Sequence, residues 1–130
     1  MPSLKAYSQK NNFEESISTK KASGLNQCPL TSALEVIGGK WKVIILYQLR
    51  GKTLRFGELK KIIPKITQKM LSQQLRELEK NKLVIRKVYA QVPPKVEYTS
   101  TELAHKLNPA LDMLCRWGSE YQKIHAEQDG

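Results

Sequence analysis

The sequence predicts a mainly α-helical domain with a small β-hairpin, in a chain of 130 residues. Apolar residues recur at three- and four-residue spacing in several consecutive segments, which is typical of amphipathic helices. One later stretch is rich in β-branched and aromatic residues around a Pro-Pro pair, which indicates two strands. Hydrophobic residues make up 40% and charged residues 26% of the chain. This balance is ordinary for one globular domain, and it excludes a disordered or collagen-like chain.

The first 26 residues differ from the rest in composition. Ser, Asn, Lys and Gln dominate them and apolar residues are isolated, so we expect residues 1–26 to form a flexible polar arm. The chain has no apolar run long enough for a membrane span, and its start has no signal-peptide pattern. We therefore expect a cytoplasmic protein with no membrane partner, folded over residues 27–130.

Two helices are predicted directly after this arm. Pro29 favours the first helical position, and Gly38-Gly39 ends the apolar stripe that follows. The segment from Trp41 to Leu49 is apolar on most sides. This pattern predicts a helix buried in the middle of a small core.

Two further helices are predicted over Phe56–Ile63, which Pro64 stops, and over Thr67–Asn81. The hydroxyl of Thr67 can cap the second of these helices. Its leucines repeat at four- and three-residue spacing on one stripe, at positions 71, 75 and 78. This helix therefore has one apolar side and one polar side.

A β-hairpin and a C-terminal helical region complete the chain. Val84–Tyr89 and Val96–Thr99 are strand-like, and the prolines between them place a loop at the hairpin tip. Thr99 and Glu102 have the spacing of a capping box for a short helix, and Asn108-Pro109 can start the last helix. Four helices, a two-stranded hairpin and a final helical region are the layout of a winged helix-turn-helix.

The charge of the chain is concentrated in its middle. The net charge is +10, and the segment Lys40–Lys95 alone carries +12, against +1 before it and −3 after it. Such confinement suggests one face that meets a polyanion such as a nucleic acid backbone. A merely solvated basic face is the alternative reading.

The polar side of the helix over Thr67–Asn81 holds amides, a hydroxyl and cations, which are the groups that contact bases and phosphates in a major groove. An exposed helix with no ligand carries the same residue types, but basic segments on both sides favour convergence on double-stranded DNA. The candidate base-reading residues are Gln68, Lys69, Ser72, Gln73 and Arg76. The candidate phosphate-binding residues are Arg55, Lys65, Thr67, Arg86, Lys87 and Lys95.

From Cys28 to Tyr121 the sequence resembles the HxlR-type bacterial winged-helix transcriptional regulators. The resemblance lies in four motifs in order: GGKW at 38–41, RFGEL at 55–59, ITQKMLSQQLRELE at 66–79 and VPPKVEY at 92–98. One departure is Asn81-Lys82, where such proteins often have a glycine turn. The resemblance implies a homodimeric DNA-binding repressor or activator, with dimer contacts made by the first ordered helix and the C-terminal helix.

The last helix independently permits a dimer. From Pro109 to Ile124 its apolar residues span an arc of roughly 160°, wider than the ~100° that one core needs. The excess suits a second subunit, although a deeply buried terminal helix would look the same. A twofold dimer predicts a palindromic operator. The candidate interface residues are Leu30, Leu34, Leu114, Trp117 and Tyr121.

Cys28 directly precedes Pro29, which places its sulfur at a helix N-terminus where free amides favour the thiolate. Some members of the resembled family sense oxidants, quinones or aldehydes through a cysteine at this position. We therefore hypothesise a redox or electrophile switch at Cys28, beside the alternative of a packed apolar residue. Cys115 is interpreted as structural.

The sequence argues against an enzyme, a metal site or a bound cofactor. Its two histidines and two aspartates form no evident catalytic pattern, and neither cysteine has the spacing of a zinc site. The remaining alternatives are an RNA-binding or nonspecific nucleic-acid-binding module and a protein-interaction winged helix. Aromatic residues in the basic stretch lie mostly on apolar faces, which disfavours base stacking on single strands.

Overall fold

The computed structural model describes residues 28–129, and the predicted arm over residues 1–26 lies outside them. The chain divides into two units after Gly39. In the first unit the described element is helix α2 (Pro29–Ile37), which confirms the predicted bounds. A Cβ atom at Gly38 would collide with the carbonyl oxygen of Leu34, and Gly39 has a φ of 83°. These two glycines therefore end the helix for steric reasons.

The second unit contains three helices at its centre, namely α3 (Trp41–Gln48), α4 (Phe56–Ile62) and α5 (Gln68–Lys80). They agree with the predicted segments to within one residue at each end. The core is made by aliphatic side chains of these helices together with a few from the sheet and the C-terminal region. The buried apolar residues are Ile45, Leu46, Leu49, Leu59, Ile63, Ile66, Leu71, Leu75, Leu78, Leu83, Val84, Tyr98, Ala104 and Leu111.

Helix α3 is less buried than its composition predicts. Ile45, Leu46 and the following Leu49 are at most 2% exposed, whereas Tyr47 is 41% exposed. The expectation of a helix buried on most sides was wrong, because α4 and α5 cover one side and the start of the C-terminal helix covers only part of the other. The apolar side that remains open belongs to a cavity described below.

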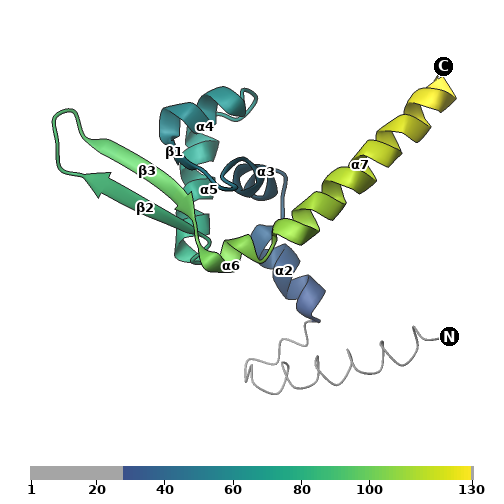
Figure 1. Cartoon of the computed structure of the whole chain (residues 1–130), viewed down its shortest axis with the longest axis horizontal. Helices are drawn as coiled ribbons and strands as arrows, with labels where there is room; N and C mark the ends of the chain where they lie inside the picture. Colours follow the sequence, from purple (N-terminus) through teal and green to yellow (C-terminus); the bar gives the residue numbers. More distant parts are fainter. Residues whose placement is uncertain (1–27, 130) are drawn as a thin grey trace. The chain divides into compact units, whose positions relative to one another are not determined.

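The sheet has three strands rather than two. Strands β2 (Val84–Tyr89) and β3 (Lys95–Ser100) form the predicted hairpin, and β1 (Thr53–Arg55) pairs antiparallel with β3, giving the order β1-β3-β2. The hairpin extends away from the helices of its unit (Figure 1). Strand β1 was missed because three residues are too few to show an alternating apolar and polar pattern. Its pairing with a strand more than 40 residues away determines its conformation.

The C-terminal region has a different cap from the predicted one. Thr101, not Thr99, caps the short helix α6 (Glu102–His105), since its hydroxyl oxygen accepts the N–H of Ala104 at 3.2 Å. Thr99 belongs to β3, where its hydroxyl lies 3.0 Å from that of Thr53. The long helix α7 (Asn108–Asp129) follows. The overall architecture confirms the predicted winged helix-turn-helix.

Helix α5 ends where the sequence departs from the resembled family. Lys82 adopts a left-handed conformation with a φ of 62°. The N–H groups of Lys82 and Leu83 donate to the carbonyls of Glu79 and Leu78, at 3.0 and 2.9 Å. This pair of hydrogen bonds is a Schellman motif, in which glycine is the usual residue. Lysine therefore occupies a position that favours glycine, and the turn still forms.

Candidate nucleic-acid interface

Helix α5 presents its polar side to solvent because its apolar side is packed inward. Thr67 caps the helix, its hydroxyl oxygen accepting the N–H of Met70 at 3.1 Å. Leu71, Leu75 and Leu78 are at most 1% exposed. The opposite side carries the predicted base-reading residues, which together line one surface hollow: Gln68, Lys69, Ser72, Gln73 and Arg76. All five are exposed except Ser72, which is half-buried.

A second hollow of about 340 Å³ joins α5 to the wing, which we define as the β2–β3 hairpin. Arg76 of α5 and Arg86 of β2 both line it, with Tyr98 of β3 behind them. Arg86 lies directly opposite Tyr98 in the sheet, so both share the sheet face that is turned towards α5. Two guanidinium groups, one from α5 and one from the strand that follows it, thus border one hollow, which also contains the acid Glu79.

The other predicted phosphate-binding cations of the sheet lie on its opposite face. Lys87 on β2 and Arg55 on β1 are both directly opposite Glu97 of β3. Residues directly opposite in antiparallel strands share a face, and successive residues alternate. The sequence grouped Arg86 with Lys87 as one phosphate-binding set, but the structure places them on opposite faces of the wing.

Glu97 is at the centre of that outer face, and sequence reasoning missed it. Lys95 Nζ lies 3.7 Å from its Oε2 atom. A hydrogen bond from Tyr89 and the charges of Lys95 and Arg55 lower the pKa of the Glu97 carboxyl, although desolvation opposes them. Lys87 Nζ and Lys95 Nζ each lie 4.9 Å from the centre of the Tyr89 ring. This acid follows the basic segment by two positions, but its place opposite two cations depends on strand pairings that the sequence did not show.

Lys65 and Thr67 lie in the connection between α4 and α5, next to the start of α5. Both are exposed. The oxygen of Thr67 is engaged as the helix cap, but its hydroxyl hydrogen remains available to donate. These two residues are therefore beside Gln68, at the end of the helix that enters a groove first in a helix-turn-helix.

Cys28 is the N-cap residue of α2, as its position before Pro29 predicts. Its Sγ atom accepts the N–H of Thr31 at 3.4 Å and lies 3.2 Å from the Thr31 hydroxyl oxygen. The residue is half-buried. One first-turn amide of the helix thus donates to the sulfur, and a hydroxyl group lies within hydrogen-bond distance of it.

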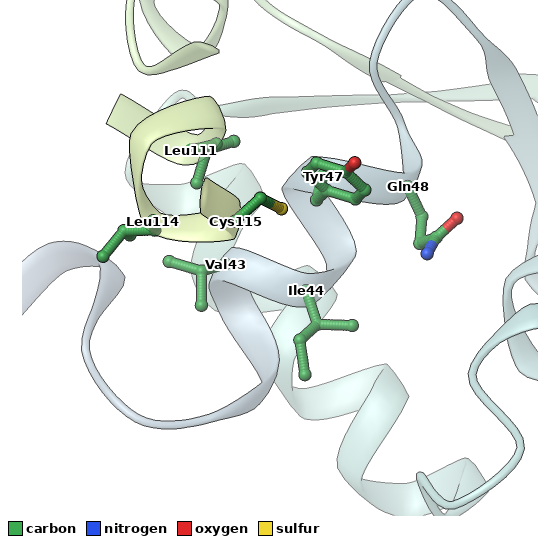
Figure 2. Close-up of a pocket in the computed structure, with 7 residues that line it drawn as sticks. All are labelled: Val43, Ile44, Tyr47, Gln48, Leu111, Leu114 and Cys115. Carbon is green, nitrogen blue, oxygen red and sulfur yellow. The ribbon is translucent and has the colours of Figure 1, made fainter. Parts of the chain in front are cut away.

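The second cysteine lies between α3 and α7, at a cavity of about 290 Å³ (Figure 2). Cys115 is exposed at its edge, and a hydrogen bond with Cys115 raises the pKa of the Tyr47 hydroxyl. Figure 2 shows that α3 and α7 both contribute apolar side chains to the walls. The residues lining the cavity are Val43, Ile44, Tyr47, Gln48, Leu111, Leu114 and Cys115.

The predicted dimer residues are exposed. Leu30 and Leu34 of α2 are 68% and 56% exposed, and Trp117 of α7 is 63% exposed. Along α7 this exposed apolar surface continues through Met113, Leu114, Tyr121 and Ile124. Trp117 and Tyr121 stack with ring centres 5.3 Å apart. The sequence left a deeply buried terminal helix as an alternative. The structure excludes it, because this side of α7 is exposed.

Residues 28–129 contain no group of three or more acidic, histidine or cysteine side chains placed to hold a metal ion. Within the same described range, no helix is long and apolar enough to cross a membrane.

Comparison with known proteins relates this chain to one family of regulators. Residues 36–126 match the model of the HxlR-like helix-turn-helix family. The HTH-type transcriptional regulator YkvN of Bacillus subtilis (strain 168) is 58% identical over 102 residues, which cover 78% of this chain and 83% of YkvN. An HTH-type transcriptional regulator of Methanothermobacter thermautotrophicus is 48% identical over 103 residues, covering 79% and 78%.

Solved structures show the same similarity. The redox regulator HypR in its reduced form has 45% sequence identity and a TM-score of 0.71, covering 76% of this chain and 98% of HypR. Its oxidized form has 49% identity and a TM-score of 0.68, covering 72% and 96%. The region matched by the family model, residues 36–126, spans the helices and the sheet that position the polar side of α5.

Proposed function

This chain belongs to the HxlR-like helix-turn-helix family and is an HTH-type transcriptional regulator, and we propose that it binds a palindromic operator as a homodimer. The observation that carries this proposal is the orientation of α5. Its leucines are packed inward and its amides and cations are exposed beside Arg86 of the wing. A helix so presented fits the major groove, with the wing along the adjacent backbone. The site of action is the cytoplasm.

In this proposal the five exposed or half-buried polar residues of α5 read bases. Arg76 and Lys69 suit guanine, Gln68 and Gln73 suit adenine, and Ser72 suits either. The phosphate contacts come from Lys65 and Thr67 at the start of α5, and from the wing and β1. Arg86 of the wing approaches DNA from the α5 side, whereas Lys87 and Lys95 of the wing and Arg55 of β1 approach it from the outer face.

The homodimer is supported by the exposed apolar surface of α7. Several large apolar side chains on one side of a helix are costly to leave in water, and their burial between two copies removes that cost. Leu30 and Leu34 add a second exposed apolar stripe on α2. Twofold symmetry would place two α5 helices about 34 Å apart, one turn of DNA.

A redox or electrophile switch at Cys28 is the proposed means of control. The position of its sulfur at a helix N-terminus, where it accepts the N–H of Thr31 and lies beside the Thr31 hydroxyl, supports thiolate formation. The similarity to the redox regulator HypR supports the same idea. The test is the alkylation rate of the wild type against pH, with a Cys28→Ser variant to subtract the reaction of Cys115. A rate no different from that of an ordinary free thiol ends this part of the proposal.

The operator is tested by selection and salt titration. Sequences selected from a random duplex library should be palindromic, and the protein should bind them roughly 10³-fold or more tighter than random duplex. Both affinities should fall steeply as salt rises, because phosphate contacts release counterions. Equal affinity for selected and random duplexes would instead identify a nonspecific nucleic-acid-binding protein.

A further inference from the structure

Helix α7 is joined to the rest of its unit through its first two turns. Among its described residues Leu111 alone is buried, at 4% exposure. Asp112 forms an ion pair with Arg50, and Cys115 borders the cavity shared with α3. Beyond this point the helix extends away from the body of its unit (Figure 1). The direction of α7 therefore depends on very few contacts.

The ion pair is the contact that fixes orientation at two points. Arg50 Nη1 and Nη2 donate to the two carboxylate oxygens of Asp112, at 2.5 and 3.2 Å. A two-point contact between a planar guanidinium and a planar carboxylate fixes relative orientation as well as distance. The Arg50 guanidinium also lies over the Tyr47 ring, 5.3 Å from its centre. Arg50 is thus held both by α7 and by α3.

Packing on the cavity side of the junction does not fix this direction. The space of about 290 Å³ between α3 and α7 has Leu114 and Cys115 at its edge, both exposed. Close packing normally resists tilting of one helix against another, and here that resistance is missing on one side. The ion pair, together with the hydrogen bond between Tyr47 and Cys115, is left to hold the angle.

We propose that the Arg50–Asp112 pair sets the separation of the two α5 helices in the dimer, and so determines which half-site spacing the regulator accepts. This inference rests on the proposed function, because it requires a dimer formed through α7. Ile124 lies 12 residues beyond Asp112, about 18 Å along the helix. A tilt of about 10° at Asp112 moves Ile124 by about 3 Å, close to the ~3.4 Å of one base-pair step. Because the dimer has twofold symmetry, the same displacement occurs in both subunits.

The test is selection of operators by the full chain from duplex libraries that hold the half-sites at every separation. The wild type should enrich one separation and bind sites lengthened by one base pair about tenfold more weakly. Asp112→Asn keeps the size of the side chain and removes its charge. It should select the same half-sites at two or more separations, with the tenfold penalty falling to about threefold or less.

Three further variant proteins keep the test decisive. Glu127→Gln makes the same charge change on α7 far from the junction and should retain the wild-type spacing. Arg50→Asp combined with Asp112→Arg exchanges the partners and should restore the preference for one spacing. Arg50→Lys keeps the charge without the two-point contact and should relax the spacing as Asp112→Asn does, which covers the case of a poorly folded Asp112 variant.

The results separate this inference from the proposed function. If the wild type enriches palindromes at one separation and Asp112→Asn and Arg50→Lys do so just as sharply, the role of the ion pair is refuted and the regulator remains. If the wild type enriches no palindrome at all, the dimeric regulator itself is refuted.

Discussion

Helices α5 and α7 have similar sequence patterns and opposite surroundings. Each has an apolar side and a polar side. Leu71, Leu75 and Leu78 of α5 are at most 1% exposed, whereas Leu114 and Trp117 of α7 are 57% and 63% exposed. The difference arises because α5 packs against α3 and β2, while α7 meets α3 only at its start. An apolar side therefore shows where a helix needs a partner, and the fold decides whether the same chain supplies it.

The largest effect is expected from shortening a leucine on the covered helix. Leu75→Ala removes a side chain that is 1% exposed and should lower the free energy of unfolding by about 2–5 kcal/mol. Leu114→Ala is the matched change on α7 and should cost about 0.5 kcal/mol or less at concentrations where the chain is monomeric. Urea unfolding of both variants measures the contrast. Equal losses would mean that α7 is as well packed as α5.

The exposed side of α7 should instead control assembly. Trp117→Ala removes the large ring that stacks on Tyr121 and should cost about 2 kcal/mol or more of dimerisation free energy, roughly a 30-fold weaker dimer. Sedimentation equilibrium measures the dissociation constant. Glu127→Gln serves as the control on the same helix. A wild type that stays monomeric throughout would contradict the assigned role of this surface.

The polar side of α5 is compared with the wing by two single substitutions. Arg76→Ala should remove about 1–3 kcal/mol of discrimination between operator and random duplex, since a guanidinium reads a base edge. Lys95→Ala should weaken binding to all duplexes alike and reduce the salt slope by about one. Titrations on both duplexes at several salt concentrations measure these effects. If Arg76→Ala weakens both duplexes equally, the residue does not read bases.

The smallest effect concerns acid stability at the outer face of the wing. The pKa of Glu97 is lowered in the folded state by Tyr89, Lys95 and Arg55. A depressed pKa stabilises the fold above the ordinary value of 4.5, and this contribution is lost as the pH falls through the lower, folded value. Wild-type stability should therefore fall more steeply than that of Glu97→Gln below about pH 5. Unfolding curves against pH test this, with Glu127→Gln as the control, and parallel curves would contradict it.

Much of the fold followed from local pattern. The helix over Gln68–Lys80 was predicted from leucine spacing and the Thr67 cap, and the hairpin from its β-branched residues around the prolines. These signals act within one turn or one strand, so the sequence alone carries them. Strand β1 carried no such signal, because only pairing with β3 makes it a strand. Likewise, the sequence predicted Thr99 as the cap of the short helix, and this was wrong because Thr99 pairs within the sheet and Thr101 caps the helix.

The candidate site divides in the same way. The residues on the polar side of α5 were predicted as a set because helical geometry alone places them together. The wing set was mixed, because Arg86 and Lys87 are neighbours in sequence yet face opposite sides of the sheet. The role of Glu97 among the outer cations depends on three strands being side by side.

The sequence by itself determined the main helices, the Thr67 cap of α5, the excess of basic charge and the two sides of α5, because these properties depend on residues a few positions apart. Only the tertiary structure decided which apolar sides were covered, which cations share a face and how Arg50 meets Asp112. Those features join residues dozens of positions apart. Their energies exist only once the chain has brought the partners together.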